Sequence, residues 1–133
     1  MKAGRREFLK STVAVAASAA LFSVPTIARG AAPRVVVVGG GFAGASCARA
    51  LRKADPSIAV TLVEPNATFT ACPFSNAVIA GLRELSAQQF TYERIAADGI
   101  VVARTTATAV DAQARSVTLA DGTRLPYDRL VLA

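Results

Sequence analysis

The feature that most constrains the fold is a glycine pattern placed between a strand-like and a helix-like segment. Residues 39–44 read Gly-Gly-Gly-Phe-Ala-Gly and spell G-x-G-x-x-G. Residues 34–38 before them read Arg-Val-Val-Val-Val, which is typical of a strand buried on both faces. The helix-compatible residues 45–54 follow, and Asp55 and Pro56 end them. The pattern therefore sits where a strand would turn into a helix.

A second strand-like run, residues 59–64, ends in Glu64, 20 residues after Gly44. Strand, glycine turn, helix and a second strand with an acidic end complete the fingerprint of a dinucleotide site. Gly39 would permit the tight turn, Gly41 would let a pyrophosphate approach the backbone, and Gly44 would let the helix pack on the strand. The helix N-terminus would attract the phosphates. The alternative is a glycine-rich turn that binds nothing.

Glu64 also bears on which dinucleotide is bound. Its carboxylate would accept hydrogen bonds from the ribose hydroxyls of the adenosine and would repel a 2′-phosphate, so NADP is not expected. The fingerprint by itself does not distinguish FAD from NAD.

The second half of the chain favours FAD. Residues 107–111 and 116–119 alternate like antiparallel strands, residues 121–122 are an Asp-Gly turn, and residues 124–127 read as a return strand. Residues 129–133 read as another buried strand. This order resembles the FAD domain of the flavoproteins with two dinucleotide-binding domains. We therefore expect an α/β fold, an incomplete Rossmann-like FAD-binding domain with a central parallel sheet and a β-meander.

Cys72 is the candidate reactive thiol. It lies shortly before a helix-like run, residues 77–82, for which Ser75 or Asn76 would be the N-cap. The field of a helix N-terminus favours thiolate. In flavoproteins of this layout, the loop after the second strand runs along the extended FAD, so Cys72 could add to the flavin 8α-methyl group as a thioether. The alternative is a buried structural cysteine, which is how we interpret Cys47.

The first residues have the pattern of an export signal. Arg5 and Arg6 resemble the twin-arginine motif, and residues 11–24 are an uncharged run that is too short to span a bilayer, which takes about 20 residues. We expect residues 1–30 to be a twin-arginine export signal, residues 31–133 to be the N-terminal part of an FAD-binding domain, and the protein to be periplasmic. The alternative is a basic amphipathic helix on a membrane or nucleic acid.

The charge distribution argues against a polyanion partner. The formal net charge is +6, but residues 31–133 hold 10 basic and 8 acidic residues, a balance of only +2. Neither nucleic-acid binding nor a membrane span after signal removal is expected. The sequence has no histidine and only two cysteines, which excludes a His-based triad and a histidine-ligated metal. We expect no metal site.

Four stretches carry a resemblance that covers nearly the whole chain: Arg5-Arg6, residues 35–44, residues 60–66 (Val-Thr-Leu-Val-Glu-Pro-Asn) and residues 72–76 (Cys-Pro-Phe-Ser-Asn). Together they resemble the flavoprotein subunits of the flavocytochrome c sulfide dehydrogenases. The resemblance implies FAD held covalently by Cys72, oxidation of sulfide, and transfer of electrons to a c-type cytochrome subunit.

The resemblance also bears on individual residues. The redox-active cysteines of that family would lie outside this chain, so we expect no catalytic residue here and no sulfide turnover by this chain alone. The residues expected to contact FAD are Gly39, Gly40, Gly41, Phe42, Ala43, Gly44, Glu64, Pro65, Cys72 and Ala107. Two alternatives stay open: a sulfide:quinone or NADH-linked flavin reductase, and a nucleotide-binding module without catalysis.

The remaining stretch is less informative. Residues 85–97 are expected to form a loop and a short helix over one face of the sheet. Arg83 and Arg94 are expected to be solvated charges. Asp111 and Asp128 are expected to be turn residues.

Overall fold

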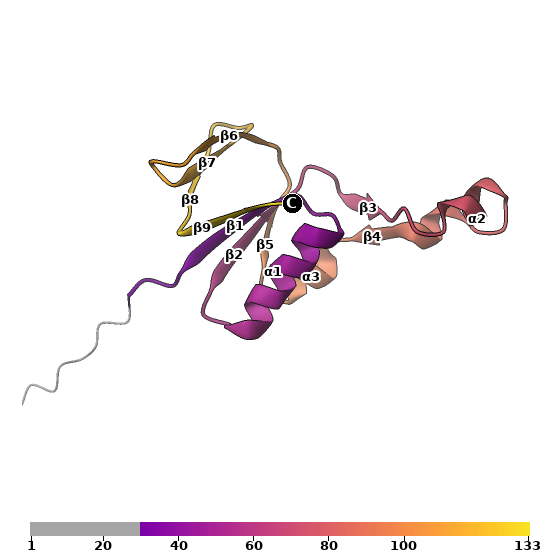
Figure 1. Ribbon diagram of the computed structural model, residues 1–133, viewed down its shortest axis with the longest axis horizontal. Coiled ribbons are helices and arrows are strands. Elements are labelled where there is room, and N and C mark those ends of the chain that lie inside the picture. The colour runs from indigo at the N-terminus through magenta and orange to yellow at the C-terminus, as the bar shows by residue number, and fades with distance from the viewer. Residues whose placement is uncertain (1–29) are drawn as a thin grey trace, which may run out of the picture. The chain divides into compact units, whose positions relative to one another are not determined.

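The computed structural model describes residues 30–133, and a four-stranded parallel sheet forms its centre (Figure 1). The strand order is β5-β2-β1-β9, with β1 (Arg34–Val38) between β2 (Ala59–Val63) and β9 (Arg129–Leu132). β5 (Val101–Ala103) pairs with the outer edge of β2 and was not predicted. The predicted parallel sheet is confirmed. The predicted export signal lies outside the described residues, apart from Gly30.

Two helices cover one face of this sheet. α1 (Phe42–Ala54) and the short α3 (Glu93–Ala97) pack there, and the apolar residues they bury with the sheet are Val35, Val37, Ala48, Val60, Leu62, Tyr92, Ile95 and Ile100. α1 begins three residues earlier than predicted because Gly41, in an extended conformation, serves as its N-cap. The earlier start brings the first turn of the helix directly to the glycine pattern.

The antiparallel meander covers the other face (Figure 1). It consists of β6 (Ala107–Asp111), β7 (Ser116–Leu119) and β8 (Arg124–Pro126), as the sequence predicted. Its buried side chains pack on the alternate residues of the parallel strands, and this second apolar cluster is Val36, Val63, Val117, Leu119 and Tyr127. The predicted α/β fold with a meander is thereby confirmed.

A long extension leaves the sheet between β2 and α3. We call residues 68–91 the β3–β4 extension: β3 (Thr68–Thr70) pairs antiparallel with β4 (Gln89–Thr91), and α2 (Ser75–Ile79) and the 3₁₀ turn Leu85–Gln88 lie between them. Figure 1 shows α2 at the far end, away from the parallel sheet. Neither β3 nor β4 was predicted, since three residues are too few to show an alternating pattern.

The helix that was predicted over residues 77–82 begins and ends earlier in the structure. α2 spans Ser75–Ile79, and its N-cap is Phe74 rather than Ser75 or Asn76. Phe74 has a left-handed backbone (φ 69°), and its carbonyl oxygen accepts a hydrogen bond from the buried Gln88 side chain at 3.0 Å. The turn before α2 is therefore held by a residue far along the chain, which local patterns do not reveal.

A charged pair, Arg34 and Asp128, joins the starts of β1 and β9 and supports their register. Asp128 lies at a bend, as expected, and its carboxylate also accepts hydrogen bonds from the Arg34 backbone N–H at 2.7 Å and the Arg34 guanidinium at 3.3 Å. Asp111 has the expected turn role, since its carboxylate accepts from the Ala114 N–H at 2.8 Å.

Among residues 30–133, no helix is long and apolar enough to cross a bilayer.

Candidate dinucleotide site

Gly39 makes the sharp turn after β1. Its φ is +104°, and its N–H donates to the Val63 carbonyl at the end of β2 at 2.9 Å. A Cβ at this position would collide with the backbone carbonyl of Ala133, which follows β9. Both the backbone conformation and the close approach of β9 require glycine here.

Gly44 is required for a different reason. It lies in the first turn of α1, and a Cβ there would overlap the carbonyl oxygen of Gly39. The helix can approach the turn this closely only without a side chain. Gly39 and Gly44 thus have the turn and packing roles that the sequence predicted.

Gly41 is unlike its neighbours because nothing in the described chain requires glycine there. Its φ is −67°, which any residue adopts, and the nearest atom to a Cβ would be the Phe69 Cε2 at an ordinary 3.8 Å. The missing Cβ leaves open space in front of the first turn of α1, which has no side-chain N-cap and no acidic residue. That combination fits a pyrophosphate, which needs close access to backbone N–H groups.

The carboxylate of Glu64 is built into the same turn. Glu64 is 8% exposed; its Oε2 accepts from the Gly40 N–H at 2.8 Å, and its Oε1 accepts from the Asn66 N–H at 2.9 Å and the Asn66 amide at 2.7 Å. Burial by itself would raise the pKa of Glu64, but the hydrogen bonds from Asn66 and Gly40 outweigh it and lower that pKa. The carboxylate is therefore ionised at neutral pH, and Oε2 retains acceptor capacity.

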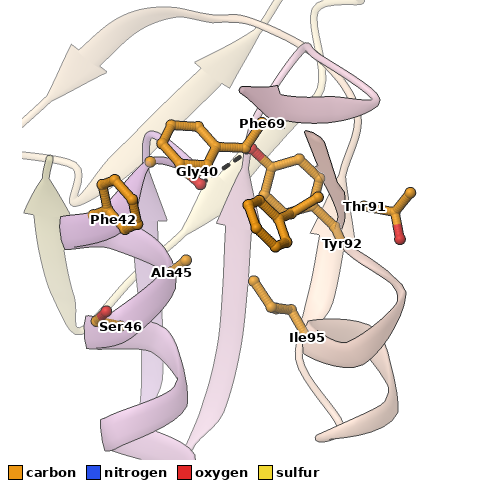
Figure 2. A pocket seen from close by; sticks show the side chains of 10 residues that line it. Gly40, Phe42, Ala45, Ser46, Phe69, Thr91, Tyr92 and Ile95 are labelled. Carbon is orange, nitrogen blue, oxygen red and sulfur yellow. Dashed lines mark hydrogen bonds between the residues drawn. The ribbon is translucent and has the colours of Figure 1, made fainter. Parts of the chain in front are cut away.

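Tyr92 holds the other side of Gly40. It is 4% exposed, and its hydroxyl donates to the Gly40 carbonyl oxygen at 3.0 Å (Figure 2). Burial, and then the charge of Glu64, raise the pKa of the Tyr92 hydroxyl, so it stays a neutral donor. This role could not be predicted from local patterns, since Tyr92 lies 52 residues from Gly40.

Two hollows meet at the glycine turn. A cleft of about 610 Å³ is lined by Gly39, Gly40, Gly41, Glu64, Asn66, Ala67, Thr68, Phe69, Thr70, Tyr92 and Ala133. A smaller and largely apolar pocket of about 210 Å³ lies toward α1 and α3 (Figure 2), where the Phe42 and Phe69 rings meet edge to face with centroids 4.9 Å apart. Gly40, Gly41 and Tyr92 line both hollows, whereas Glu64 lines only the larger cleft.

Cys72 lies beyond β3 and is exposed. It lines a pocket of about 240 Å³ together with Thr70, and Thr70 also lines the larger cleft that contains Glu64. The other cysteine, Cys47, is half-buried rather than buried as predicted, because it lies on the flank of α1 and not on the face that packs against the sheet. Cys72 is therefore the more accessible of the two thiols.

The cleft brings together only some of the predicted contact residues. Gly39, Gly40, Gly41 and Glu64 line it. Phe42 lines the smaller pocket, Gly44 is buried beneath the turn, and Ala43 and Pro65 are exposed beside it. Ala107 lies in β6 and packs with the meander. Asn66 and Tyr92 were not predicted to take part.

Arg83 and Arg94, which were predicted to be solvated charges, are both exposed. Arg94 lies on α3. Arg83 donates to the Ala87 carbonyl and lies 5.6 Å from the centroid of the Phe74 ring. Neither arginine lines the cleft at the glycine turn.

Two curated proteins resemble this chain, one closely over a short stretch and one more distantly over most of its length. A sulfide dehydrogenase (flavocytochrome c) flavoprotein chain from Chlorobaculum thiosulfatiphilum is 76% identical over 45 residues, which are 34% of this chain and 94% of that sequence. The resemblance predicted from the sequence is thereby confirmed. A probable ferredoxin reductase from Castellaniella defragrans is 35% identical over 104 residues, 75% of this chain and 25% of the reductase.

Solved structures share the fold. The sulfide:quinone oxidoreductase of Aquifex aeolicus matches with a TM-score of 0.72 at 28% identity, covering 76% of this chain and 24% of that one. Putidaredoxin reductase, in its covalent complex with putidaredoxin, matches with a TM-score of 0.65 at 36% identity, covering 77% and 26%. The chain spans about a quarter of the length of these two proteins. A family model described as pyridine nucleotide-disulphide oxidoreductase matches residues 33–133, and the chain belongs to that family.

Proposed function

We propose that residues 31–133 bind FAD as part of an oxidoreductase. The observation that carries this proposal is the pairing of an open Gly41 with the ionised Glu64 in one cleft. Gly41 has no internal reason to be glycine, so the space in front of it is explained by a ligand that approaches the backbone. Membership of an oxidoreductase family supports a redox cofactor rather than another nucleotide.

Different residues of the cleft would bind different parts of the cofactor. Glu64 would accept hydrogen bonds from the ribose hydroxyls of the adenosine, using the capacity left on Oε2. The first turn of α1, which lacks a side-chain cap, would bind the pyrophosphate through its free N–H groups. When bound, FAD supplies chemistry that accepts two electrons and releases them singly.

We assign Cys72 to the flavin end of the cofactor, as a thioether anchor. Thr70 lines both the Glu64 cleft and the Cys72 pocket, so the two hollows follow one another along β3. An extended dinucleotide held at Glu64 and Gly41 would therefore reach the Cys72 side of the extension. The exposure of Cys72 supports this role, because a thiol has to be accessible to react.

For the whole protein, we infer sulfide oxidation with electron transfer to a c-type cytochrome subunit. The support is the name of the Chlorobaculum relative, which is 76% identical over the 45 residues matched. The reaction would need residues beyond this chain, which spans about a quarter of several relatives. Export by a twin-arginine signal to the periplasm belongs to the same proposal and rests on Arg5 and Arg6.

A second candidate is a flavin reductase with a different electron acceptor, because the Aquifex sulfide:quinone oxidoreductase shares the fold at a TM-score of 0.72. Anaerobic reduction of the full-length protein by sulfide, followed by addition of cytochrome c or a quinone analogue, separates the two. Faster reoxidation by cytochrome c supports the first candidate, and faster reoxidation by the quinone supports the second.

The covalent anchor is tested by the mass of denatured protein. The full-length protein is denatured in acid, digested, and the peptide carrying Cys72 is weighed. We expect that peptide to carry the mass of FAD and Cys72→Ser to release all its flavin on denaturation, while Cys47→Ser keeps it attached. An unmodified Cys72 peptide together with released FAD would reject the anchor and leave the binding site itself intact.

A further inference from the structure

We propose that Tyr92 is a positioning residue for the dinucleotide site, and that its hydroxyl orients the Gly40–Gly41 peptide for pyrophosphate binding. This inference rests on the proposed function of the cleft. Its physical basis is the hydrogen bond from the Tyr92 hydroxyl to the Gly40 carbonyl oxygen, 3.0 Å long and buried (Figure 2).

The peptide that Tyr92 holds is the one that presents Gly41 to the cleft. Gly40 C=O and Gly41 N–H belong to one planar unit and point in opposite directions in its trans form. Fixing the carbonyl oxygen therefore fixes the direction of the Gly41 N–H. Within residues 30–133, that N–H donates to no backbone carbonyl, which leaves it available to a ligand.

The two preceding peptides of the turn are held by the end of β2 and by Glu64, which follows it. Gly39 N–H donates to the Val63 carbonyl at 2.9 Å, and Gly40 N–H donates to Glu64 at 2.8 Å. The Gly40–Gly41 peptide is held by the side chain of Tyr92, the N-cap residue of α3, which lies beyond the β3–β4 extension. Tyr92 thus links the glycine turn to the segment that follows the β3–β4 extension, which contains Cys72.

The fit around Gly40 supports a specific role. A Cβ on Gly40 would lie 2.6 Å from the Tyr92 hydroxyl and 2.7 Å from the Glu64 Cγ, so Gly40 is glycine because these two side chains flank it. A hydrogen bond from Tyr92 also polarises the peptide and makes the Gly41 N–H a better donor to an anion. A purely apolar side chain would fill the same space without either effect.

The test uses the full-length protein with Cys72→Ser, so that its flavin can be removed, and measures the dissociation constants of ADP and adenosine by calorimetry. Adenosine reports the Glu64 end of the site, and ADP adds the pyrophosphate. We expect Tyr92→Phe to weaken ADP by about 5-fold to 10-fold, the value of one hydrogen bond, while adenosine changes by less than about 2-fold. Tyr127→Phe is the matched control, because Tyr127 is the other tyrosine and is also buried.

The outcomes separate this inference from the proposed function. Unchanged ADP affinity in Tyr92→Phe, or an equal loss of ADP and adenosine, would overturn the positioning role. The adenosine affinity of the variant also shows whether its site is folded. A folding defect would reduce the affinities for ADP and adenosine equally. If the parent protein binds neither ligand, the proposed FAD site fails first. Faster hydrogen exchange at the Gly41 amide in Tyr92→Phe would be a second supporting result.

Discussion

The carboxylate of Glu64 accepts a hydrogen bond from the backbone N–H of Gly40 at 2.8 Å, which joins the end of β2 to the turn after β1. The same carboxylate is held by Asn66 on its other oxygen. This buried charge shapes the glycine turn, and in the proposed FAD site the remaining acceptor capacity of Oε2 would bind a ribose hydroxyl. Changes at Glu64 should affect both.

We expect Glu64→Gln to weaken FAD binding by about 10-fold to 100-fold. The amide keeps the shape of the side chain but loses the charge that strengthens the hydrogen bonds, each worth about 1.5–3 kcal/mol when charged. Fluorescence titration of flavin-free protein, with Cys72→Ser in the parent and in each variant, measures the effect. Glu84→Gln, at an exposed residue without a side-chain cap role, is the control and should bind FAD like the parent. Equal affinities of parent and Glu64→Gln would remove Glu64 from the site.

The lowered pKa of Glu64 predicts a pH dependence of stability. Its ordinary pKa is 4.5, and the folded protein lowers it, so the carboxylate stabilises the fold above about pH 4.5 and this contribution disappears as the pH falls through the lower folded pKa. The difference in free energy of unfolding between the parent and Glu64→Gln should be constant near pH 7 and shrink below pH 4.5. Urea unfolding at pH 7, 5, 4 and 3 measures it. A difference that grows on acidification would show that the folded pKa is raised.

The three glycines of the fingerprint should respond differently to alanine. Gly44→Ala places a Cβ on the Gly39 carbonyl, and Gly39→Ala combines a collision with a φ of +104°, so each should destabilise the fold by about 3 kcal/mol or more. Gly41→Ala meets only an ordinary contact and should cost less than about 1 kcal/mol, while weakening FAD by at least about 10-fold. Thermal unfolding and FAD titration, both with Cys72→Ser present, measure the two effects. A stable Gly41→Ala that binds FAD normally would contradict the proposed pyrophosphate site.

Asp128→Asn should lower stability slightly and leave FAD affinity unchanged. The hydrogen bonds and charge of Arg34 lower the pKa of Asp128, so the pair contributes above the ordinary pKa of 3.8 and loses that contribution as the pH falls through the lower folded value. Both side chains are partly exposed, which keeps the effect small and salt-dependent. Melting curves at low and high salt test this. Because Arg34 begins β1 and the site follows its other end, a large loss of FAD affinity would mean that the pair does more than fix register.

The β1–α1–β2 unit could be predicted because its signals are local. The valines of residues 35–38 indicated a buried strand. Gly39 and Gly44 stand where a turn and a packing contact exclude a side chain, and Gly41 faces open space. Glu64 was recognised from its distance to the glycines along the chain. These features require only a few neighbouring residues to be read correctly.

Features made by distant residues could not be predicted. Tyr92 reaches Gly40 across 52 residues, and Gln88 holds the Phe74 carbonyl across 14. β4 forms because β3 offers it a partner, and β5 because β2 does, although both strands have only three residues. Both contain residues that favour β structure, such as Val101 and Val102, but three residues are too few to predict a strand, so tertiary pairing decided these elements.

The most direct measurement of the central claim is a titration of the flavin-free full-length protein, carrying Cys72→Ser, with FAD. We predict saturable binding of one FAD per chain, displacement by ADP, and marked weakening by both Glu64→Gln and Gly41→Ala. Absence of saturable binding, or binding that neither variant weakens, would contradict an FAD site at the glycine turn.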